Sequence, residues 1–196
     1  MPPTLSARLV RPWAHPAGLL GRLAGWEMAL GKAALDDEIA ALLDPRPTDR
    51  VLEVGHGPGT TIARLAELVP SGRVVGVDPS VVMHRQAARR NRRRIAARRV
   101  ELHVASAERL PFDDGGFDRA LTLHSLHHWS DPERGLAEIG RVLVPGGRLL
   151  VGLRGTAPDT IARAERAIAG AGFDLERTAP ARRGGSTLLV AARSPG

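Results

Sequence analysis

The chain has 196 residues, of which 43% are hydrophobic, and a formal net charge of +7. This length suits one domain with a full core, and the lack of cysteine excludes disulfide frameworks, thiol nucleophiles and cysteine-ligated zinc. No apolar run is long enough to cross a membrane, and the first residues lack a signal-peptide core. We therefore expect a cytoplasmic protein with no membrane partner.

The N-terminal part of the chain begins with a proline-rich stretch, which is followed by helical spacing over residues 18–43. Glycines weaken this predicted helix, and two prolines end it. We expect residues 1–45 to form an arm and a lid helix ahead of a domain made of residues 46–196. Trp26 lies on the helix and is a candidate for either the core or the cover of a site.

The most informative element comes next. A short apolar strand, predicted over 50–54, runs into Gly55, Gly57 and Gly59, and a helix is predicted over 59–69. Glycine lets the backbone turn tightly and lie against a ligand, and a helix start offers free N–H groups. Strand, glycine turn and helix in this order are typical of a nucleotide site at the carboxyl end of a parallel strand.

A second strand, predicted over 73–77, ends in Asp78. An acid at the tip of the strand after the glycine turn is placed to hold the hydroxyls of a ribose. The dinucleotide fingerprint G-x-G-x-x-G is absent, because Thr60 or Ile62 would stand in its third glycine position. The phosphate loop G-x-x-x-x-G-K-[ST] is absent as well, so a different kind of nucleotide is indicated.

A helix predicted over 80–97 carries the densest basic run of the chain, Arg89-Arg90-Asn91-Arg92-Arg93-Arg94. Arginines at these positions point to different sides of a helix, so they do not form one stripe that reads a nucleic-acid groove. The run has two interpretations at this stage: a solvated helix face or a surface for an anionic partner.

Strands and helices continue to alternate beyond this helix. Strands are predicted over 100–104, 117–123 and 147–153, and helices over 132–142 and 157–171. This alternation predicts a parallel sheet covered by helices on both faces. Two last strands, over 173–178 and 186–192, are joined by a connection too short for a helical crossover and should pair antiparallel. The expected fold is a Rossmann-like, doubly wound, seven-stranded α/β sheet, mostly parallel with one antiparallel strand.

Further sequence blocks accompany the motif E-x-G-x-G-x-G of residues 53–59. They are Ser106-Ala107-Glu108-Arg109-Leu110-Pro111-Phe112, Gly116-Phe117-Asp118, His127-His128-Trp129 and Arg141-Val142-Leu143-Val144-Pro145-Gly146-Gly147. In order and spacing, over roughly residues 50–154, the chain resembles the small-molecule branch of class I S-adenosylmethionine-dependent methyltransferases. The resemblance implies S-adenosyl-L-methionine as cofactor, S-adenosyl-L-homocysteine as product and a small-molecule methyl acceptor as partner.

The resemblance also implies which residues meet the cofactor. These are Glu53, Gly55, His56, Gly57, Gly59, Asp78, Pro79, Met83, Ser106, Ala107, Glu108 and Leu123. Asp78 would hold the ribose hydroxyls through charge-assisted hydrogen bonds, whereas Glu53 would organise the glycine loop. The family commonly has Asp where this chain has Ser106. Because serine accepts a hydrogen bond with less charge, the adenine would be held mainly through the backbone of Ala107.

The segment Leu123-His124-Ser125-Leu126-His127-His128-Trp129, after the fourth strand, would border the methionine end of the cofactor and the acceptor. Methyl transfer needs an aligned nucleophile and a water-free site, and a neutral imidazole can take the proton of the acceptor. We expect His128 to be the catalytic residue nearest the acceptor. His124 is a second candidate, through its ring or only its backbone carbonyl.

Three residues are expected to meet the acceptor: Trp26, Trp129 and Arg154. Arg154 follows the fifth strand, where a guanidinium can meet an anionic group of a substrate. No metal is expected, because no acid or cysteine completes a zinc ligand set around the histidines.

Two other functions stay open. An RNA or DNA methyltransferase would suit the positive charge, but no [DN]-P-P-[FYW] motif follows the fourth strand. Aromatic residues make up only 3% of the chain and include no tyrosine for base stacking. A non-catalytic, cofactor-binding regulatory protein would keep the fold but lack an open acceptor pocket. The protein is expected to be a monomer or a homodimer.

Overall fold

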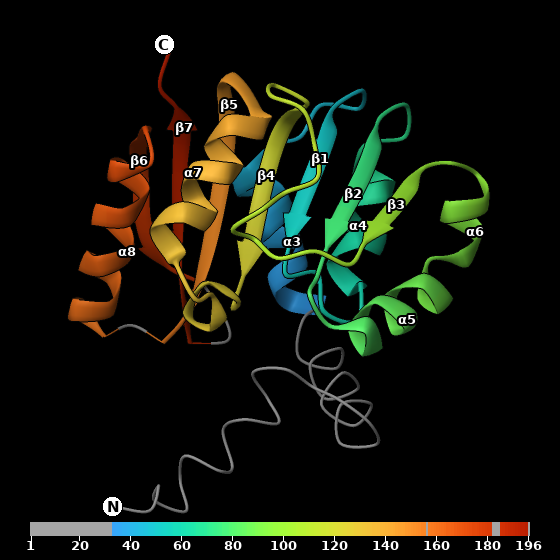
Figure 1. The fold of residues 1–196 in the computed structure, drawn as a ribbon, viewed down its shortest axis with the longest axis horizontal. Coiled ribbons are helices and arrows are strands. Elements are labelled where there is room, and N and C mark those ends of the chain that lie inside the picture. Colours follow the sequence, from blue (N-terminus) through green and yellow to red (C-terminus); the bar gives the residue numbers. More distant parts are fainter. Residues whose placement is uncertain (1–32, 156, 182–184, 196) are drawn as a thin grey trace, which may run out of the picture.

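The computed structural model describes residues 33–155, 157–181 and 185–195, and seven strands within them form one sheet (Figure 1). The strands are β1 (Arg50–Val54), β2 (Arg73–Val77), β3 (Val100–His103), β4 (Phe117–Leu123), β5 (Leu143–Arg154), β6 (Phe173–Pro180) and β7 (Ser186–Arg193). Their order is β3-β2-β1-β4-β5-β7-β6, and β7 runs antiparallel to both of its neighbours while the other pairs are parallel. The predicted Rossmann-like sheet with one reversed strand is confirmed.

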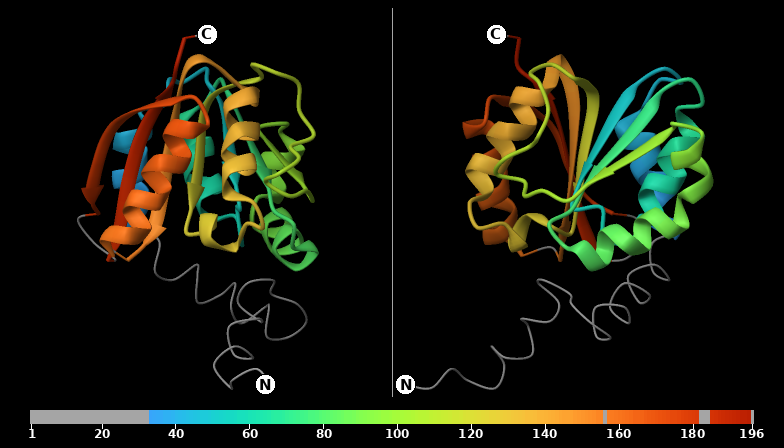
Figure 2. Two further views of the ribbon diagram at one scale, coloured as in Figure 1. Left: turned by 60° about the vertical axis from the view of Figure 1, so that its left-hand side comes forward. Right: turned by 45° about the vertical axis from the view of Figure 1, so that its right-hand side comes forward.

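Helices cover both faces of this sheet (Figure 2). They are α3 (Ala33–Leu43), α4 (Thr60–Leu68), α5 (Val81–Arg90), α6 (Arg92–Ala96), α7 (Pro132–Val142) and α8 (Pro158–Gly170), with a short 3-10 helix η1 (Leu126–His128). Helices α3 and α4 pack on one face and α7 and α8 on the other, while α5 and α6 lie beside β3 at one end of the sheet.

The sheet separates two hydrophobic cores, and the central strands supply side chains to both. Val51 of β1 belongs to the core beneath α4, whereas its neighbour Leu52 belongs to the core beneath α7. Successive side chains of a strand point to opposite faces, so a strand buried on both faces becomes a continuous apolar run. This is why β1 and β2 stand out in the sequence.

The helix predicted over 80–97 is wrong in one respect, because it is broken at Asn91 into α5 and α6. Asn91 is fully buried, and its side-chain amide donates to the carbonyl of Ala87 at 3.1 Å. A side chain that hydrogen-bonds nearby backbone competes with the regular helix ladder. The arginine run is therefore divided between two short helices.

Helix α3 falls within the helix predicted over 18–43, of which residues 33–43 are described, and it ends at Leu43, just before the two prolines expected to end it. Ile39 and Leu43 are buried in the core beneath α4. Arg119 donates to the carbonyl of Leu43 at 3.1 Å, which fixes the end of the helix. Trp26 and the predicted lid lie outside the described residues, so their role and the boundary at residue 45 stay predictions.

The carboxyl ends of β1 to β5 share one edge of the sheet, the lower edge in Figure 1. In open α/β sheets, ligands bind at this edge. Among the described residues, no helix has both the length and the apolar character that a membrane span requires.

Candidate functional site

The glycine loop after β1 takes a left-handed backbone at each glycine, with φ of +80° at Gly55, +53° at Gly57 and +74° at Gly59. A Cβ on Gly55 would lie 2.4 Å from Ser125 Oγ, and one on Gly59 would lie 2.7 Å from the Cβ of Ala87. Around Gly57, by contrast, nothing lies within 4 Å of the Cβ position. The loop is thus packed tightly at both ends and open in its middle.

Asp78 connects this loop to the next element. It is only 7% exposed, and its carboxylate accepts from the N–H of Gly57 at 2.9 Å and from the N–H of Ser80 at 2.8 Å. The Ser80 hydroxyl accepts in turn from the N–H of Met83 and caps α5. Each carboxylate oxygen has capacity for a second hydrogen bond, so Asp78 can also accept from the hydroxyls of a ligand.

Asn91 holds the same loop in place from the end of α5, and sequence reasoning missed it. Its side-chain Nδ2 donates to the carbonyl of Gly59 at 3.0 Å, and the neighbouring Arg90 donates to the carbonyl of Pro58 at 3.1 Å. The one signal in the sequence was an uncharged amide inside a run of arginines. The hydrogen bond to Gly59 depends on how α5 packs against the loop, and no local sequence pattern predicts this packing.

Four of the side chains predicted to meet a cofactor are at most 2% exposed: Glu53 and His56 at 0%, and Met83 and Leu123 at 2%. The His56 ring lies over Gly76 of β2, where a Cβ would approach its Cδ2 to 2.9 Å. His56 Nδ1 lies 2.7 Å from the carbonyl of Gly57. The His56 ring therefore supports the glycine loop from within, and a contact between His56 and the ligand stays a prediction.

The loop after β3 contains an exposed Ser106, a buried Ala107 and Glu108. The Glu108 carboxylate accepts from the N–H of Ser130 at 2.9 Å and its hydroxyl at 2.8 Å, and from the N–H of Asp131 at 3.3 Å. Partial burial raises the pKa of Glu108, but these hydrogen bonds and one from its own backbone outweigh it and lower the pKa. Glu108 thus fastens the β3 loop to the start of α7.

Ser125 is the centre of the loop after β4, although the sequence did not single it out. Its hydroxyl lies 2.9 Å from Thr122 Oγ1, accepts from the indole N–H of Trp129 at 3.0 Å, and faces Gly55. The Trp129 ring lies against Gly135 of α7, where a Cβ would be 2.5 Å from the ring. These contacts give Trp129 a packing role, and its contact with an acceptor stays a prediction.

The histidines of this segment point in different directions. His124 has a left-handed backbone, with φ of +54°, and its ring Nε2 lies 2.8 Å from the hydroxyl of Ser186 at the start of β7. His127 and His128 follow in η1, with ring centroids 3.9 Å apart. His128 is half-buried and His127 is exposed. The fold thus separates His124 from the other two histidines by turning it toward β7.

A hollow of about 180 Å³ opens beside η1 and is lined by His127, Leu153, Arg154 and Thr160; we call it the Arg154 hollow. It brings together the loop after β4, the end of β5 and the first turn of α8. Loss of solvation and the charge of Arg154 both lower the pKa of His127. Both effects favour the neutral form of the His127 imidazole, and Arg154 is the cation of the hollow.

Comparison with known proteins identifies this arrangement. The family model described as a methyltransferase domain matches residues 52–151, about half of the chain, and includes the glycine loop, Asp78 and the histidine segment. The chain belongs to the class I S-adenosylmethionine-dependent methyltransferases.

Two relatives illustrate how much of the chain is shared with other proteins. An uncharacterized 37.1 kDa protein in transposon TN4556 of Streptomyces fradiae is 47% identical over 111 residues, which cover 56% of this chain and 31% of that protein. The 27-O-demethylrifamycin SV methyltransferase of Amycolatopsis mediterranei is 36% identical over 60% of this chain and 43% of its own length. This methyltransferase chain thus spans less than half of either relative.

A solved structure shows the same fold. The crystal structure of an S-adenosylmethionine-dependent methyltransferase from Aquifex aeolicus superimposes with a TM-score of 0.72 at 20% identity, over 83% of this chain and 92% of that one. At this level of identity the likeness concerns the fold alone.

The residues of this methyltransferase fit the cofactor of the family. The open face of Gly57 leaves space at the loop for a ligand backbone, and Asp78 offers hydrogen-bond acceptors beside it. Exposed Pro79 and Ser106 flank this position on the loops after β2 and β3. Among the residues that the structure describes, no three His, Cys, Asp or Glu side chains are grouped to hold a metal ion.

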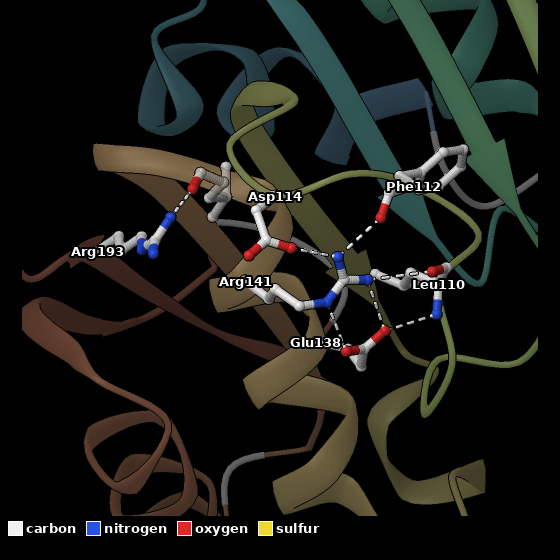
Figure 3. A network of polar contacts seen from close by, with 7 residues as sticks. Leu110, Phe112, Asp114, Glu138, Arg141 and Arg193 are labelled. Atoms are coloured by element: carbon white, nitrogen blue, oxygen red, sulfur yellow. Dashed lines mark hydrogen bonds and ion pairs between the residues drawn. The ribbon is translucent and has the colours of Figure 1, made fainter.

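The sequence block that begins at Arg141 has a structural role (Figure 3). The guanidinium of Arg141 donates to the carbonyls of Phe112 at 2.7 Å and Leu110 at 3.1 Å. It also donates to the carboxylates of Asp114 at 2.7 Å and Glu138 at 2.8 Å. Hydrogen bonds that Arg141 donates to these acids raise the pKa of Arg141, and the hydrogen bond from Arg141 lowers the pKa of Glu138. This network holds the connection from β3 to β4 against α7.

Proposed function

We propose that this chain binds S-adenosylmethionine and transfers its methyl group to a small-molecule acceptor. The observation that carries the proposal is the bridge that Asp78 makes between Gly57 and Ser80, beside the open middle of the glycine loop. The sulfonium of the cofactor makes its methyl carbon electrophilic. The protein then has to hold the two reactants in line and exclude water.

The cofactor half of the site lies on β1, β2 and β3. The backbone of Gly55, Gly57 and Gly59 would follow the methionine part, and Asp78 would accept from the ribose hydroxyls. Ser106 and the backbone of Ala107 would meet the adenine. Glu53, His56, Met83 and Leu123 would act by supporting these groups, because they are buried.

The acceptor half would lie on the loop after β4 and the end of β5. His128 is the group that we assign as the general base, because it is half-buried on η1, at the carboxyl edge that also carries the glycine loop. His124 would position the segment through its contact with Ser186. The related rifamycin methyltransferase, by its name, modifies a small molecule, and this supports a small acceptor here.

The arginine run favours the small-molecule function over the nucleic-acid one. Arg90 holds the carbonyl of Pro58, Arg94 pairs with Glu67 at 2.8 Å, and Arg99 donates to the carbonyl of Val69 at 3.0 Å. Two of the five arginines of the run, Arg90 and Arg94, thus attach α5 and α6 to the glycine loop and α4, and Arg99 beyond the run does the same. A cytoplasmic location and a monomeric or homodimeric state accompany the proposal as expectations.

The proposal is tested by calorimetric titration of the purified chain, freed of bound cofactor, with S-adenosylmethionine and S-adenosylhomocysteine. Ligand at 100 times its Kd should stabilise the fold by about 2.7 kcal/mol. Asp78→Ala should weaken binding by about 1.5–3 kcal/mol, the scale of a hydrogen bond to a charged group. Asp174→Ala, which removes an exposed acid on β6, should leave binding unchanged.

Absence of heat and of a thermal shift with both ligands would contradict the proposal. A screen of small molecules with isotopically labelled S-adenosylmethionine then identifies the acceptor. A chain that binds the cofactor and methylates nothing in a broad screen would favour the non-catalytic, regulatory function.

A further inference from the structure

The Arg154 hollow contains a cation that no described acid neutralises. The arginines that hold the scaffold are paired, such as Arg141 with Glu138 at 2.8 Å and Arg148 with Glu176 at 3.3 Å. Arg154, by contrast, has no acidic side chain of the described residues within 4.0 Å, and it is exposed. Its charge is therefore available to a ligand that enters the hollow.

The other walls of the hollow also suit an anion. Thr160 brings a hydroxyl donor and lies in the first turn of α8, a helix of 13 residues whose positive dipole end lies at this turn. His127 offers an imidazole that gains a proton when a negative charge approaches. Leu153 closes the inner side with apolar surface. Asp159 is exposed in the same turn of α8 and is not among the lining residues.

The hollow lies at the carboxyl ends of β4 and β5, whereas the glycine loop and Asp78 follow β1 and β2. A ligand in the hollow would therefore lie on the acceptor side of His128, whose ring is next to that of His127. Its volume of about 180 Å³ accommodates a small oxyanion group such as a carboxylate or a phosphate.

We propose that the Arg154 hollow is a subsite for an anionic group of the methyl acceptor, a carboxylate or a phosphate, held by Arg154 and Thr160 beside His127. This inference rests on the proposed function, because it assigns the bound group to the acceptor. It predicts that the acceptor is an anionic small molecule whose methylated atom is separated from its charged group by the distance between His128 and the hollow. A guanidinium binds such groups through two parallel hydrogen bonds.

The test uses inorganic phosphate as the probe and the His127 ring as the reporter. The chain is titrated with phosphate at constant ionic strength, with and without saturating S-adenosylhomocysteine, and the imidazole signals are followed by NMR. His127→Gln assigns the signal. Bound phosphate should raise the pKa of His127, because it offsets the charge of Arg154, and chloride should not.

Arg154→Met should weaken phosphate binding by about 10- to 100-fold, the effect of losing a charged hydrogen-bond donor. The exposed Arg89→Met on α5 removes the same charge far from the hollow and should leave the phosphate affinity unchanged. Arg154→Lys should keep part of the affinity. An unaltered melting temperature shows that each variant is folded.

Equal weakening by Arg154→Met and Arg89→Met would overturn the subsite, as would a His127 signal that does not respond to phosphate. Binding of S-adenosylhomocysteine, measured in the same samples, separates the two proposals. If S-adenosylhomocysteine binds while phosphate does not, only the proposed subsite is contradicted. If it does not bind, the proposed function fails, and the titration without it still tests the hollow as an anion site.

Discussion

The two halves of the carboxyl edge differ in how their polar groups are used. In the half beyond β1 and β2, the carboxylate of Asp78 and the side-chain amide of Asn91 each make two hydrogen bonds to backbone, including Gly57 and Gly59. Beyond β4 and β5, the imidazoles of His127 and His128 and the guanidinium of Arg154 are half-buried or exposed, and His127 and Arg154 line a hollow.

This difference suits two ligands with different demands. A loop tied at both ends is fixed before a ligand arrives, so little conformational entropy is lost on binding. Half-exposed side chains around a hollow can be exchanged among relatives without changing the fold, because function resides in sites carried on a common scaffold. We therefore expect changes in the first half to alter stability and cofactor affinity together, and changes in the second half to alter turnover and binding of the acceptor.

The largest effect should come from His128→Ala, which tests the acceptor half. If His128 is the general base, turnover should fall by about 10²–10⁴-fold, while the Kd of the cofactor and the melting temperature hardly change. Steady-state kinetics and calorimetry measure both quantities. A rate that is unchanged with a genuine acceptor would reduce His128 to a packing residue, and an equal loss of cofactor affinity would move it into the cofactor half.

Gly55→Ala tests the cofactor half. The new Cβ would lie 2.4 Å from Ser125 Oγ at a residue whose φ is +80°, so we expect a loss of about 2–4 kcal/mol of unfolding free energy from overpacking and backbone strain. Denaturant unfolding measures it. Gly115→Ala is the control, because its φ is +63° and nothing lies within 4 Å of its Cβ position; strain alone should cost about 1–2 kcal/mol.

The middle of the same loop should behave differently. Gly57→Ala places its Cβ in open space, so its stability should match that of the Gly115→Ala control while its cofactor affinity falls. Gly57→Ala with wild-type affinity would show that the cofactor does not lie against this face.

Asn91→Ala should have a smaller effect, about 1–3 kcal/mol of unfolding free energy, because it leaves the carbonyl of Gly59 without its side-chain donor. The cofactor affinity should fall together with the stability, since the glycine loop loses its hydrogen bond to Asn91. The exposed neighbour provides a matched control: Arg92→Ala should change stability by no more than about 0.5 kcal/mol. Similar behaviour of the two variants would contradict the role of Asn91.

The smallest effect concerns pH. The folded pKa of Glu138 lies below its ordinary value of 4.5, mainly because Arg141 donates to it. Its contribution to stability is therefore complete above about pH 4.5 and is lost as the pH falls through the folded pKa. Glu138→Gln should lower the melting temperature at pH 7, and this difference should shrink below pH 4.5. Asp113→Asn, which changes an exposed acid of the same connection, should show no such convergence.

Much of the cofactor half was predictable from sequence because its determinants are local. Glycines at alternate positions permit the left-handed turns found at Gly55, Gly57 and Gly59, and an acid at the end of an apolar run is carried to the edge of the sheet. The helix over 80–97 was mispredicted because its break at Asn91 depends on a carbonyl 32 residues earlier in the chain.

The sequence by itself determined the order of strands and helices, the reversed last pair and the place of the glycine loop, because apolar periodicity and glycine spacing act within a few residues. Only the tertiary structure placed Ser125 against Gly55, turned His124 toward Ser186, and brought His127, Arg154 and Thr160 around one hollow. These contacts join elements far apart along the chain. They depend on how the elements pack, and packing is a property of the whole sheet that no single stretch of sequence contains.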